Sequence, residues 1–361
     1  MRIEKLDALR GIAALVVVVQ HAMEQVIHYG AFNGIFLTIL DMLFRTGMNF
    51  GRFGVAMFFL ISGFVIPFSF RGARPLCGFA ISRFFRLYPT YWVSVAMAVA
   101  IIAVTARPMP DGLTIAANVT MFQKFVGMED IVGAYWTLAI ELIFYFFCAA
   151  LFAVGWLGSA RILLAIIVFL LTTSLAGGVM SMLLDRHLPS GLPLHLSLMF
   201  LGTLMRRGWL DGDKFACRVV PLVVVSLIVS IPIIQWASYP EGALTHEYIQ
   251  PLAFTMGYYV ALAMFILVMT RQVAFKAVWL WFGAVSYSVY LLHGPFLNLC
   301  TTFITPDTGG MAIVFVLVLV VSTLGTSALV FYNVEKLSIS MGHRIMARLA
   351  PPRSAVGATF R

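Results

Sequence analysis

Long runs of apolar residues separated by short polar segments dominate this chain of 361 residues. A helix that spans a membrane needs about 20 largely apolar residues. The sequence predicts ten such helices, with bounds at roughly 8–27, 53–70, 89–106, 134–156, 161–182, 191–205, 218–237, 250–270, 277–297 and 311–333. Because these runs lack the strict alternation of a membrane β-barrel, we expect an all-α, polytopic membrane bundle in which the 191–205 run is the shortest span.

Composition supports this interpretation and excludes others. Hydrophobic residues make up 61% of the chain and charged residues 11%, whereas about 25% of an ordinary soluble domain is charged. The 15 acids and 24 bases are too few to cover the surface of a soluble protein of this length. A soluble globule, a disordered chain and a fibre are therefore excluded.

The basic residues follow the pattern of a membrane protein. With the N-terminus inside, 19 of the 24 fall in cytoplasmic segments, and the outer segments hold Arg45, Arg52, Arg107, Lys124 and Arg186. This asymmetry obeys the positive-inside rule, so both termini are expected in the cytoplasm and the net charge of +9 does not indicate nucleic-acid binding. We expect one transmembrane domain over residues 1–333 and a basic cytoplasmic tail over 334–361.

The four cysteines lie far apart in the sequence, at Cys77, Cys148, Cys217 and Cys300. A structural zinc site or a disulfide framework is usually visible as closely spaced cysteines. The sequence therefore predicts neither of them, and no metal.

The first predicted helix carries ionisable residues that lipid would not tolerate without a partner or a wet cavity. Arg10 and His21 are eleven residues apart, so they share one helix face and stand roughly 16 Å apart along the axis. Glu24 lies about one turn further out. An arginine at the inner border and a histidine packed against a neighbouring helix would be the structural alternative.

A second ionisable group lies in the helix predicted at 134–156, which runs from outside to inside. Glu141 lies five residues, or roughly 8 Å, below Trp136, at about the depth of His21. We therefore predict that Glu141 meets His21, an arrangement that suits a general base because a carboxylate orients the imidazole. A structural ion pair that locks two helices is the alternative.

The helix predicted at 277–297 carries a polar stripe. Gly283, Ser286, Tyr290 and His293 are spaced by 3, 4 and 3 residues, so they share one face. We expect this face to line a cavity and the helix to break or kink at Gly294-Pro295. Close helix packing would account for the glycine alone.

Two arginines precede the third span at the cytoplasmic side. Arg83 and Arg86, at i and i+3, share a helix face, and two forked guanidinium groups favour a polyanion such as phosphate. The positive-inside rule would also place arginines there, so this observation alone is weak. The sequence contains no Walker-type phosphate loop.

Taken together, these motifs resemble the acyltransferase family 3 of integral-membrane acyltransferases over nearly the whole chain. The matching features are LDALRG at the start, R-x10-H at Arg10 and His21, FGVAMFFLISGF at 53–64, RxxR at Arg83 and Arg86, YWTLAIE at 135–141, SYSVYLLH at 286–293 and the glutamate of NVEK. Each motif is weak alone, whereas their order and spacing in a ten-helix chain are specific.

The resemblance implies a bacterial inner-membrane enzyme that moves an acyl group, most often acetyl, from cytoplasmic acyl-CoA to a hydroxyl. The acceptor would be a carbohydrate at the outer face, such as an exopolysaccharide or O-antigen. In such proteins the R-x10-H histidine, here His21, is regarded as catalytic, and the RxxR arginines are regarded as contacts for the coenzyme phosphates.

The residues fit that chemistry. Arg10, Arg83 and Arg86 would hold acetyl-CoA or another acyl-CoA at the inner side, and His21 with Glu141 would activate the acceptor hydroxyl. We expect the lining of the path to include Glu24, Trp136, Ser286, Tyr290 and His293. A proton-coupled transporter that uses His21, Glu24 and Glu141 as a relay is the alternative, although the chain shows no internal repeat with matched broken helices.

Overall fold

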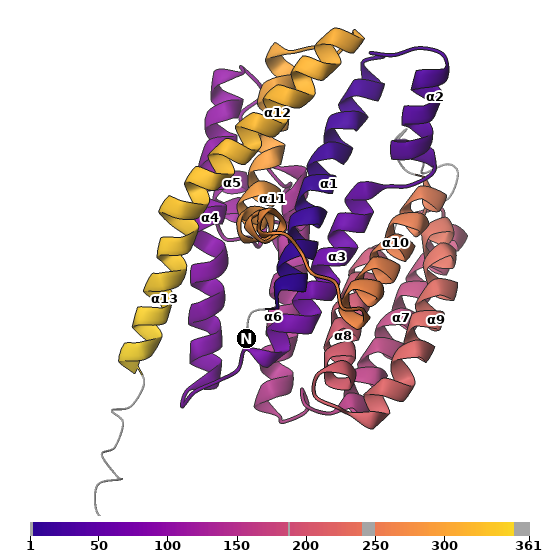
Figure 1. The fold of residues 1–361 in the computed structure, drawn as a ribbon, viewed down its shortest axis with the longest axis vertical. Helices are drawn as coiled ribbons and strands as arrows, with labels where there is room; N and C mark the ends of the chain where they lie inside the picture. The colour runs from indigo at the N-terminus through magenta and orange to yellow at the C-terminus, as the bar shows by residue number, and fades with distance from the viewer. Residues whose placement is uncertain (1–2, 187, 240–249, 350–361) are drawn as a thin grey trace, which may run out of the picture.

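The computed structural model describes residues 3–186, 188–239 and 250–349, and these ranges contain helices and no strand. Ten long helices within them form one bundle (Figure 1). Their bounds are α1 Glu4–His28, α3 Phe50–Val65, α4 Pro75–Val104, α6 Trp136–Ala153, α7 Ala160–Leu184, α8 Gly191–Trp209, α9 Lys214–Ser238, α10 Pro251–Thr270, α11 Ala277–Phe303 and α12 Gly309–Val330. Each overlaps one predicted span, although α4 begins 14 residues before the predicted start at 89, and the all-α bundle is confirmed.

Shorter elements lie in the connections between these helices. The first outer segment forms α2 (Ile35–Asp41) and η1 (Met42–Thr46), and the second forms α5 (Gly112–Val119), η3 (Gln123–Val126) and η4 (Gly133–Tyr135). A 3-10 turn, η2 (Ile66–Phe68), extends α3. At the other end of the chain, η6 (Phe331–Glu335) and α13 (Lys336–Leu349) continue α12.

The helices form two groups around a shared centre. In Figure 1, α7, α8, α9 and α10 lie on one side of the bundle and α4, α12 and α13 on the other. Between the two groups, α1 packs against α11 and α3, while α3 also packs against α8 and α10. The centre of the bundle is therefore built from α1, α3, α6 and α11, which carry most of the residues singled out above.

Among the described residues, eight segments are long and apolar enough to cross a membrane. The two predicted spans that fall short of this measure, 191–205 and 277–297, correspond to α8 and α11. Both pack against several other helices: α8 against α3, α7 and α9, and α11 against α1, α4 and α12. A helix enclosed in this way faces little lipid, so it tolerates polar side chains that a lipid-facing helix would not.

Small residues let the central helices approach closely. A Cβ on Gly283 of α11 would lie 2.0 Å from the carbonyl oxygen of Asp7 on α1, and a Cβ on Gly11 would lie 2.7 Å from the Gly283 nitrogen. Only glycine fits at such backbone contacts. This contact fixes the depth of α11 relative to α1, and hence the relative heights of the polar groups that the two helices carry.

Of the break or kink predicted at Gly294-Pro295, the break is wrong, because α11 continues through Pro295 to Phe303. A proline inside a helix lacks an N–H and leaves the carbonyl four residues earlier without its helical partner. Here that carbonyl, of Leu291, accepts a hydrogen bond of 2.8 Å from the Ser94 hydroxyl of α4. A neighbouring helix therefore replaces the missing bond, as membrane helices require.

The predicted cytoplasmic tail, 334–361, begins as part of the bundle. Helix α13 packs along α4, and Figure 1 shows it continuing from α12. Pro89 inside α4 leaves the carbonyl of Phe85 without its helical partner, and Ser338 donates a hydrogen bond of 2.8 Å to it. Residues 350–361 of the predicted tail lie outside the described residues.

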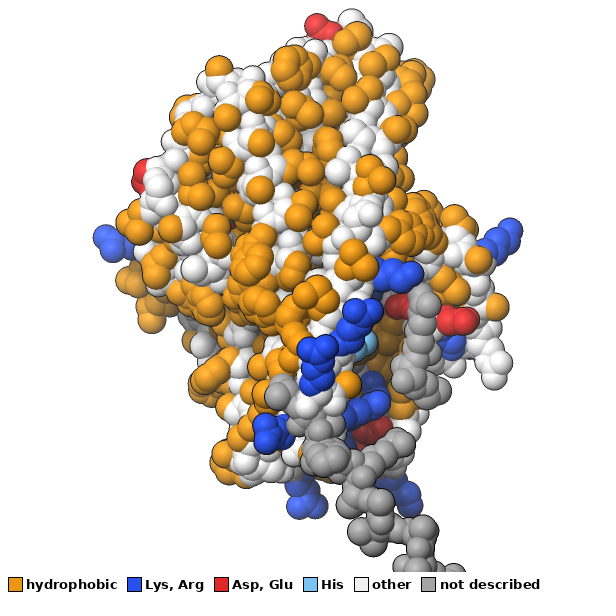
Figure 2. All heavy atoms as spheres, turned by 90° about the vertical axis from the view of Figure 1, so that its left-hand side faces the viewer, with side chains coloured by type: hydrophobic (Ala, Val, Ile, Leu, Met, Phe, Trp, Pro, Cys, Tyr) orange, Lys and Arg blue, Asp and Glu red, His pale blue; other side chains and the backbone are white. Residues whose placement is uncertain are grey.

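The surface agrees with a membrane setting. On the face drawn in Figure 2, hydrophobic side chains cover a broad upper region, whereas Lys and Arg side chains gather over the lower part. The arginines of the α3–α4 connection, Arg71 and Arg74, line a small surface pocket. The distribution matches the charge asymmetry expected from the sequence.

Candidate functional site

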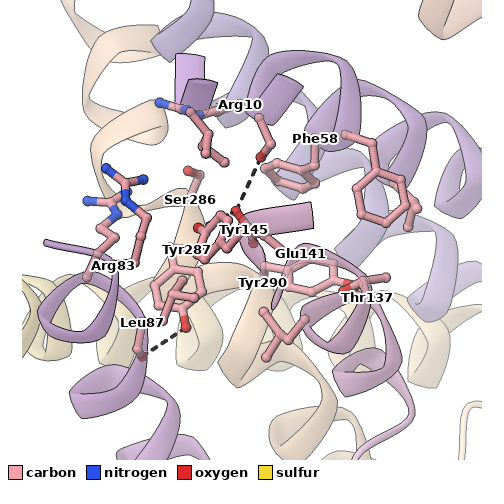
Figure 3. A pocket seen from close by; sticks show the side chains of 16 residues that line it. Arg10, Phe58, Arg83, Leu87, Thr137, Glu141, Tyr145, Ser286, Tyr287 and Tyr290 are labelled. Atoms are coloured by element: carbon pink, nitrogen blue, oxygen red, sulfur yellow. Dashed lines mark hydrogen bonds between the residues drawn. The ribbon is translucent and has the colours of Figure 1, made fainter. Parts of the chain in front are cut away.

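An inner cavity lies between α1, α3, α4, α6 and α11, with an empty volume of about 750 Å³. Three predicted cofactor-binding residues, Arg10, Arg83 and Arg86, line it together with Glu141. Figure 3 shows Arg10 and Arg83 toward one end of the cavity and Thr137 at the opposite end, with Glu141 and Tyr145 between them. The structure therefore brings the three arginines, which come from two helices, to one cavity as the sequence predicts.

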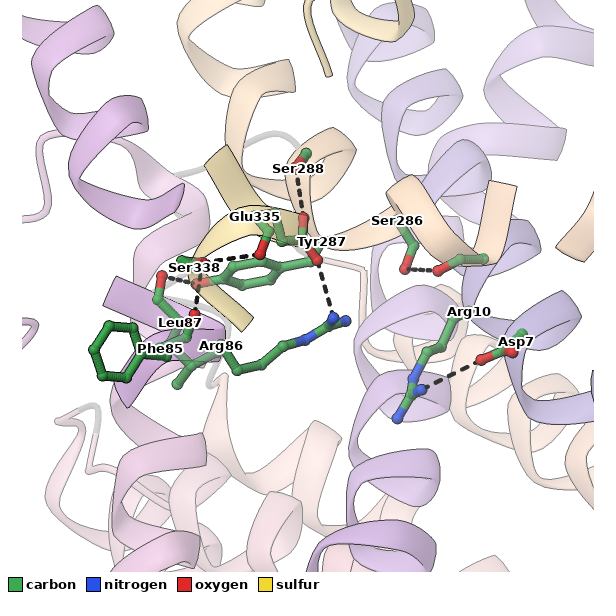
Figure 4. A network of polar contacts seen from close by, with 11 residues as sticks. Asp7, Arg10, Phe85, Arg86, Leu87, Ser286, Tyr287, Ser288, Glu335 and Ser338 are labelled. Carbon is green, nitrogen blue, oxygen red and sulfur yellow. Dashed lines mark hydrogen bonds and ion pairs between the residues drawn. The ribbon is translucent and has the colours of Figure 1, made fainter. Parts of the chain in front are cut away.

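The two arginines of the RxxR motif have different partners. Nη1 of Arg86 lies 3.0 Å from Oε1 of Glu335, a fully buried carboxylate at the end of η6 (Figure 4). The Ser288 hydroxyl donates a hydrogen bond of 2.7 Å to the other oxygen of Glu335. Arg86 therefore neutralises a buried charge, and Glu335 holds its guanidinium at the cavity wall.

Arg83 has no such counter-ion. It takes part in none of the ion pairs found among the described residues, and its buried Nε has no hydrogen-bond partner there. Its guanidinium carbon lies 5.7 Å from the ring centre of Tyr145. Arg10 is intermediate, with Nη1 3.7 Å from Asp7 Oδ1. Arg83 is therefore the arginine of the three that is best placed to bind an added anion.

The predicted contact between His21 and Glu141 is wrong. Oε1 of Glu141 accepts hydrogen bonds from the Tyr145 hydroxyl at 2.7 Å and from the Ser62 hydroxyl at 3.3 Å. No hydrogen bond or ion pair joins it to His21 among the described residues, and His21 lines a different cavity. The sequence places the two residues at similar depths in the membrane, but depth alone does not decide which residues face each other.

Glu24 is the carboxylate that contacts His21. Its Oε2 lies 2.8 Å from Nδ1 of His21, and its Oε1 accepts a hydrogen bond of 2.8 Å from the buried Gln20 amide. An ionised carboxylate only accepts hydrogen bonds, so this contact places the imidazole proton on Nδ1. Nε2 of His21 is then left with a lone pair, as a general base requires.

A second histidine stacks on the first. The rings of His21 and His293 lie 5.4 Å apart between centres and 12° from parallel. Nδ1 of the buried His293 is 2.6 Å from the Tyr290 carbonyl oxygen, which can only accept, so Nδ1 donates and Nε2 is the acceptor. Both histidines line an outer cavity with an empty volume of about 1230 Å³, which Glu24 and Trp136 also line.

Two residues, Tyr290 and Val55, line both the inner and the outer cavity. The Tyr290 hydroxyl lies 2.9 Å from Thr137 Oγ1 and donates a hydrogen bond of 3.1 Å to the Ala134 carbonyl. These bonds hold Tyr290 of α11 against the start of α6. Tyr290 and Val55 therefore separate the arginine cavity from the histidine cavity, and the two cavities adjoin.

The polar stripe on α11 serves both cavities, as predicted for a cavity-lining face. Ser286 lines the inner cavity, Tyr290 lines both, and His293 lines the outer one. Gly283, at the start of the stripe, instead packs against α1. The first residue of the stripe therefore makes a helix contact, and the other three line the cavities.

Arg52 was not predicted as a site residue and was assigned only to an outer segment. Arg52 lies in the first turn of α3 and lines the outer cavity, with its guanidinium carbon 4.3 Å from the ring centre of Phe254 and 5.8 Å from that of Trp136. Its position immediately before an apolar run was a usable signal, because an arginine within one turn of a span can lie against aromatic side chains at the interface.

His195 and Glu335 were also not predicted as site residues, although Glu335 is the glutamate of NVEK. His195 is 2% exposed and stands next to Trp136, with ring centres 5.3 Å apart. A histidine within an apolar run was a usable signal, because the same pattern singled out His21. Glu335, by contrast, carries no local sign that it reaches Arg86, which is 249 residues away in the chain.

Comparison with known proteins connects these cavities to a family. A family described as "Acyltransferase domain" matches residues 3–332. Nodulation protein 10 of Rhizobium leguminosarum bv. viciae is 31% identical over 160 residues, which cover 38% of this chain and 41% of that protein. Acyltransferase MdmB of Streptomyces mycarofaciens is 29% identical over 153 residues, which cover 40% of this chain and 38% of that protein.

The chain thus spans about two fifths of the length of each of these two relatives. No solved structure matches it. The family match extends from the residue before α1 to η6 and so includes every residue that lines the inner and outer cavities.

Proposed function

The chain belongs to this acyltransferase family, and from that premise we propose that it moves an acyl group, acetyl in the simplest case, from acyl-CoA to an acceptor hydroxyl. The donor would enter the inner cavity from the cytoplasm, and the acceptor would be a carbohydrate at the outer face of a bacterial cytoplasmic membrane. Exopolysaccharide and O-antigen are the acceptors that we favour.

The inner cavity supplies what the donor needs. Coenzyme A carries phosphate groups at one end, and guanidinium groups bind phosphate through paired hydrogen bonds. Arg83 is the principal contact because it lacks a counter-ion, while Arg10 and Arg86 add positive charge at the same cavity. Glu141, deeper in the cavity, can accept a hydrogen bond from an amide N–H or hydroxyl of the coenzyme arm.

The outer cavity supplies the base. Nε2 of His21 takes the proton of the acceptor hydroxyl, whose oxygen attacks the thioester carbonyl carbon. The new ester C–O bond forms, the C–S bond breaks, and the proton passes from His21 to the departing thiolate sulfur. Glu24 stabilises the imidazolium formed in between, because its carboxylate lies 2.8 Å from Nδ1.

One observation carries this proposal. Tyr290 and Val55 each line both cavities, so the arginine cavity and the histidine cavity are neighbours with a thin partition between them. A thin coenzyme arm anchored at Arg83 would need to pass only this partition to bring its thioester toward His21. A proton relay has no comparable use for an arginine-lined cavity on the inner side.

The first experiment measures thermal stability of the protein in lipid nanodiscs, with acetyl-CoA or free CoA added. A ligand at 100 times its Kd stabilises the folded state by about 2.7 kcal/mol. We expect both ligands to raise the unfolding temperature of the wild type, and Arg83→Ala to lose the shift. Arg218→Ala, an exposed arginine at the inner end of α9, is the matched control and should keep it.

The absence of a shift with either ligand would argue against the acyltransferase function and in favour of proton-flux measurements. A shift that persists in Arg83→Ala would place the donor site elsewhere in the bundle.

A further inference from the structure

A third cavity adjoins the outer cavity and has no role in the function proposed above. It lies between α6, α8, α9 and α10, with an empty volume of about 1180 Å³, and we call it the lateral cavity. Trp136 and Arg52 line both the lateral and the outer cavity. A ligand in the lateral cavity would therefore reach the space beside His21 by passing these two side chains.

Two polar side chains in its wall have a hydrogen-bonding group without a partner. His195 is 2% exposed, and its Nε2 lies 2.8 Å from the Tyr258 hydroxyl, whereas Nδ1 has no partner. Gln235 is 5% exposed, and its amide forms no hydrogen bond within the part of the chain that the structure describes. Buried polar groups are nearly always hydrogen-bonded in native proteins, so this pair points to a polar ligand.

The remaining wall combines aromatic and cationic groups. Trp136 presents an indole ring between the two cavities, and the guanidinium of Arg52 lies 5.8 Å from its centre. Arg52 belongs to none of the ion pairs found among the described residues, whereas Lys124 at the rim is paired with Asp130 at 3.1 Å. Apolar residues of α6, such as Ile140, line the deeper part.

This set of groups fits a sugar ring better than an alkyl chain. An alkyl chain would leave the imidazole nitrogen and the amide without partners, at a cost in free energy. Sugar hydroxyls both donate and accept hydrogen bonds, so they can satisfy Nδ1 of His195 and the Gln235 amide. The apolar C–H face of the ring can lie against the Trp136 indole.

We propose that the lateral cavity binds a glycosyl unit of the acceptor, next to the unit whose hydroxyl is acylated beside His21. This inference rests on the proposed function and adds to it the place where the acceptor is recognised. Binding energy from the unit in the lateral cavity would position the reacting hydroxyl in the outer cavity. His195 and Gln235 are binding residues here and touch no reacting atom.

The test titrates three disaccharides onto the protein in nanodiscs, which avoids sugar-based detergents, and follows the unfolding temperature. The probes are maltose, N,N′-diacetylchitobiose and cellobiuronic acid, which differ in neutral, N-acetyl and carboxylate groups. We expect at least one to stabilise the wild type. Tighter binding of the third would indicate that Arg52 recognises an acidic sugar.

Two variants locate the binding. Ala139→Phe places a phenyl ring in the lateral cavity, because Ala139 lines it and is 5% exposed, and it should abolish the shift. Gln235→Leu removes the amide at nearly constant volume and should weaken binding about tenfold, the effect of about one lost hydrogen bond. The matched controls are Ala150→Phe on the exposed side of α6 and Gln272→Leu in the exposed α10–α11 connection.

Acetyl-CoA is titrated onto the same five proteins, the wild type, the two variants and the two controls. Its shift should be equal in all of them, which shows that each variant is folded and that the donor site is intact. If acetyl-CoA stabilises the wild type and none of the disaccharides does, the lateral cavity is not a sugar site and the acyltransferase proposal is unaffected. A disaccharide shift that survives in Ala139→Phe and Gln235→Leu would also overturn the inference. If acetyl-CoA gives no shift, the proposed function itself is wrong.

Discussion

The inner and outer cavities are built in different ways, although they share Tyr290 and Val55. In the outer one, the groups that orient the His21 imidazole proton come from a single helix, since Gln20, His21 and Glu24 all belong to α1, while His293 of α11 stacks on the ring. The inner one depends on contacts between distant segments, above all the ion pair of Arg86 with Glu335. The proposed base is therefore oriented by local spacing, whereas the arginine wall of the inner cavity is held by tertiary structure.

Because of this difference, substitutions in the two cavities should affect rate and stability differently. Substitutions at the outer cavity should change the rate with little effect on folding, because His21 is partly exposed and its partner lies on the same helix. Substitutions at the inner cavity should change donor binding or stability, depending on which arginine is altered.

The largest expected effect is the loss of acyl-transfer rate in the His21→Ala variant. Loss of a positioned general base typically lowers a rate by about 10² to 10⁴, and we expect that loss with an unchanged acetyl-CoA shift in nanodiscs. His28→Ala, at the outer end of the same helix, is the control. A near-normal rate in His21→Ala would remove His21 from the mechanism.

Glu24→Gln and Glu141→Gln distinguish the two carboxylates. A hydrogen bond to a charged group contributes about 1.5–3 kcal/mol, so Glu24→Gln should lower kcat about 10- to 100-fold without changing the KM for acyl-CoA. Glu141→Gln should instead raise that KM, because Glu141 lines the inner cavity, where we propose that the donor binds. Steady-state kinetics with varied acyl-CoA measure both effects. The reverse pattern would restore the pairing of His21 with Glu141.

Arg86→Ala and Arg83→Ala should differ in stability. Removing one partner of a buried ion pair costs about 3–5 kcal/mol, and we expect the lower end for Arg86→Ala because that side chain is 33% exposed. Adding Glu335→Gln to Arg86→Ala should restore most of the loss, whereas Arg83→Ala should unfold near the wild-type temperature. Thermal unfolding without ligand is the measurement, and equal losses in both arginine variants would contradict this comparison.

The smallest effect is expected for Tyr290→Phe. This change removes the hydroxyl that binds Thr137 and the Ala134 carbonyl, a loss of about 1 kcal/mol. A looser partition should let water reach the thioester, so acyl-CoA hydrolysis without an acceptor should rise about fivefold. Release of free thiol measures it, and Tyr29→Phe, on the outer side just after α1, is the control. Unchanged hydrolysis would mean that Tyr290 does not limit access.

Much of the architecture follows from the sequence. The ten long helices coincide with ten apolar runs because lipid requires each spanning backbone to satisfy its own hydrogen bonds. The stripe from Ser286 to His293 lines the two cavities because residues three and four apart share a helix face. Arg10 and His21 share a face of α1 for the same reason, and they line the inner and outer cavities respectively.

Only the tertiary structure decided which groups meet. Local spacing fixes the face of a helix, but the rotation and depth of one helix against another depend on close contacts such as Gly11 with Gly283. For this reason the sequence placed Glu141 beside His21, while the fold turned Glu141 toward Tyr145 and left Glu24 as the partner. The pairing of Arg86 with Glu335 was hidden for the same physical reason, since contacts between distant helices are set by packing and not by periodicity.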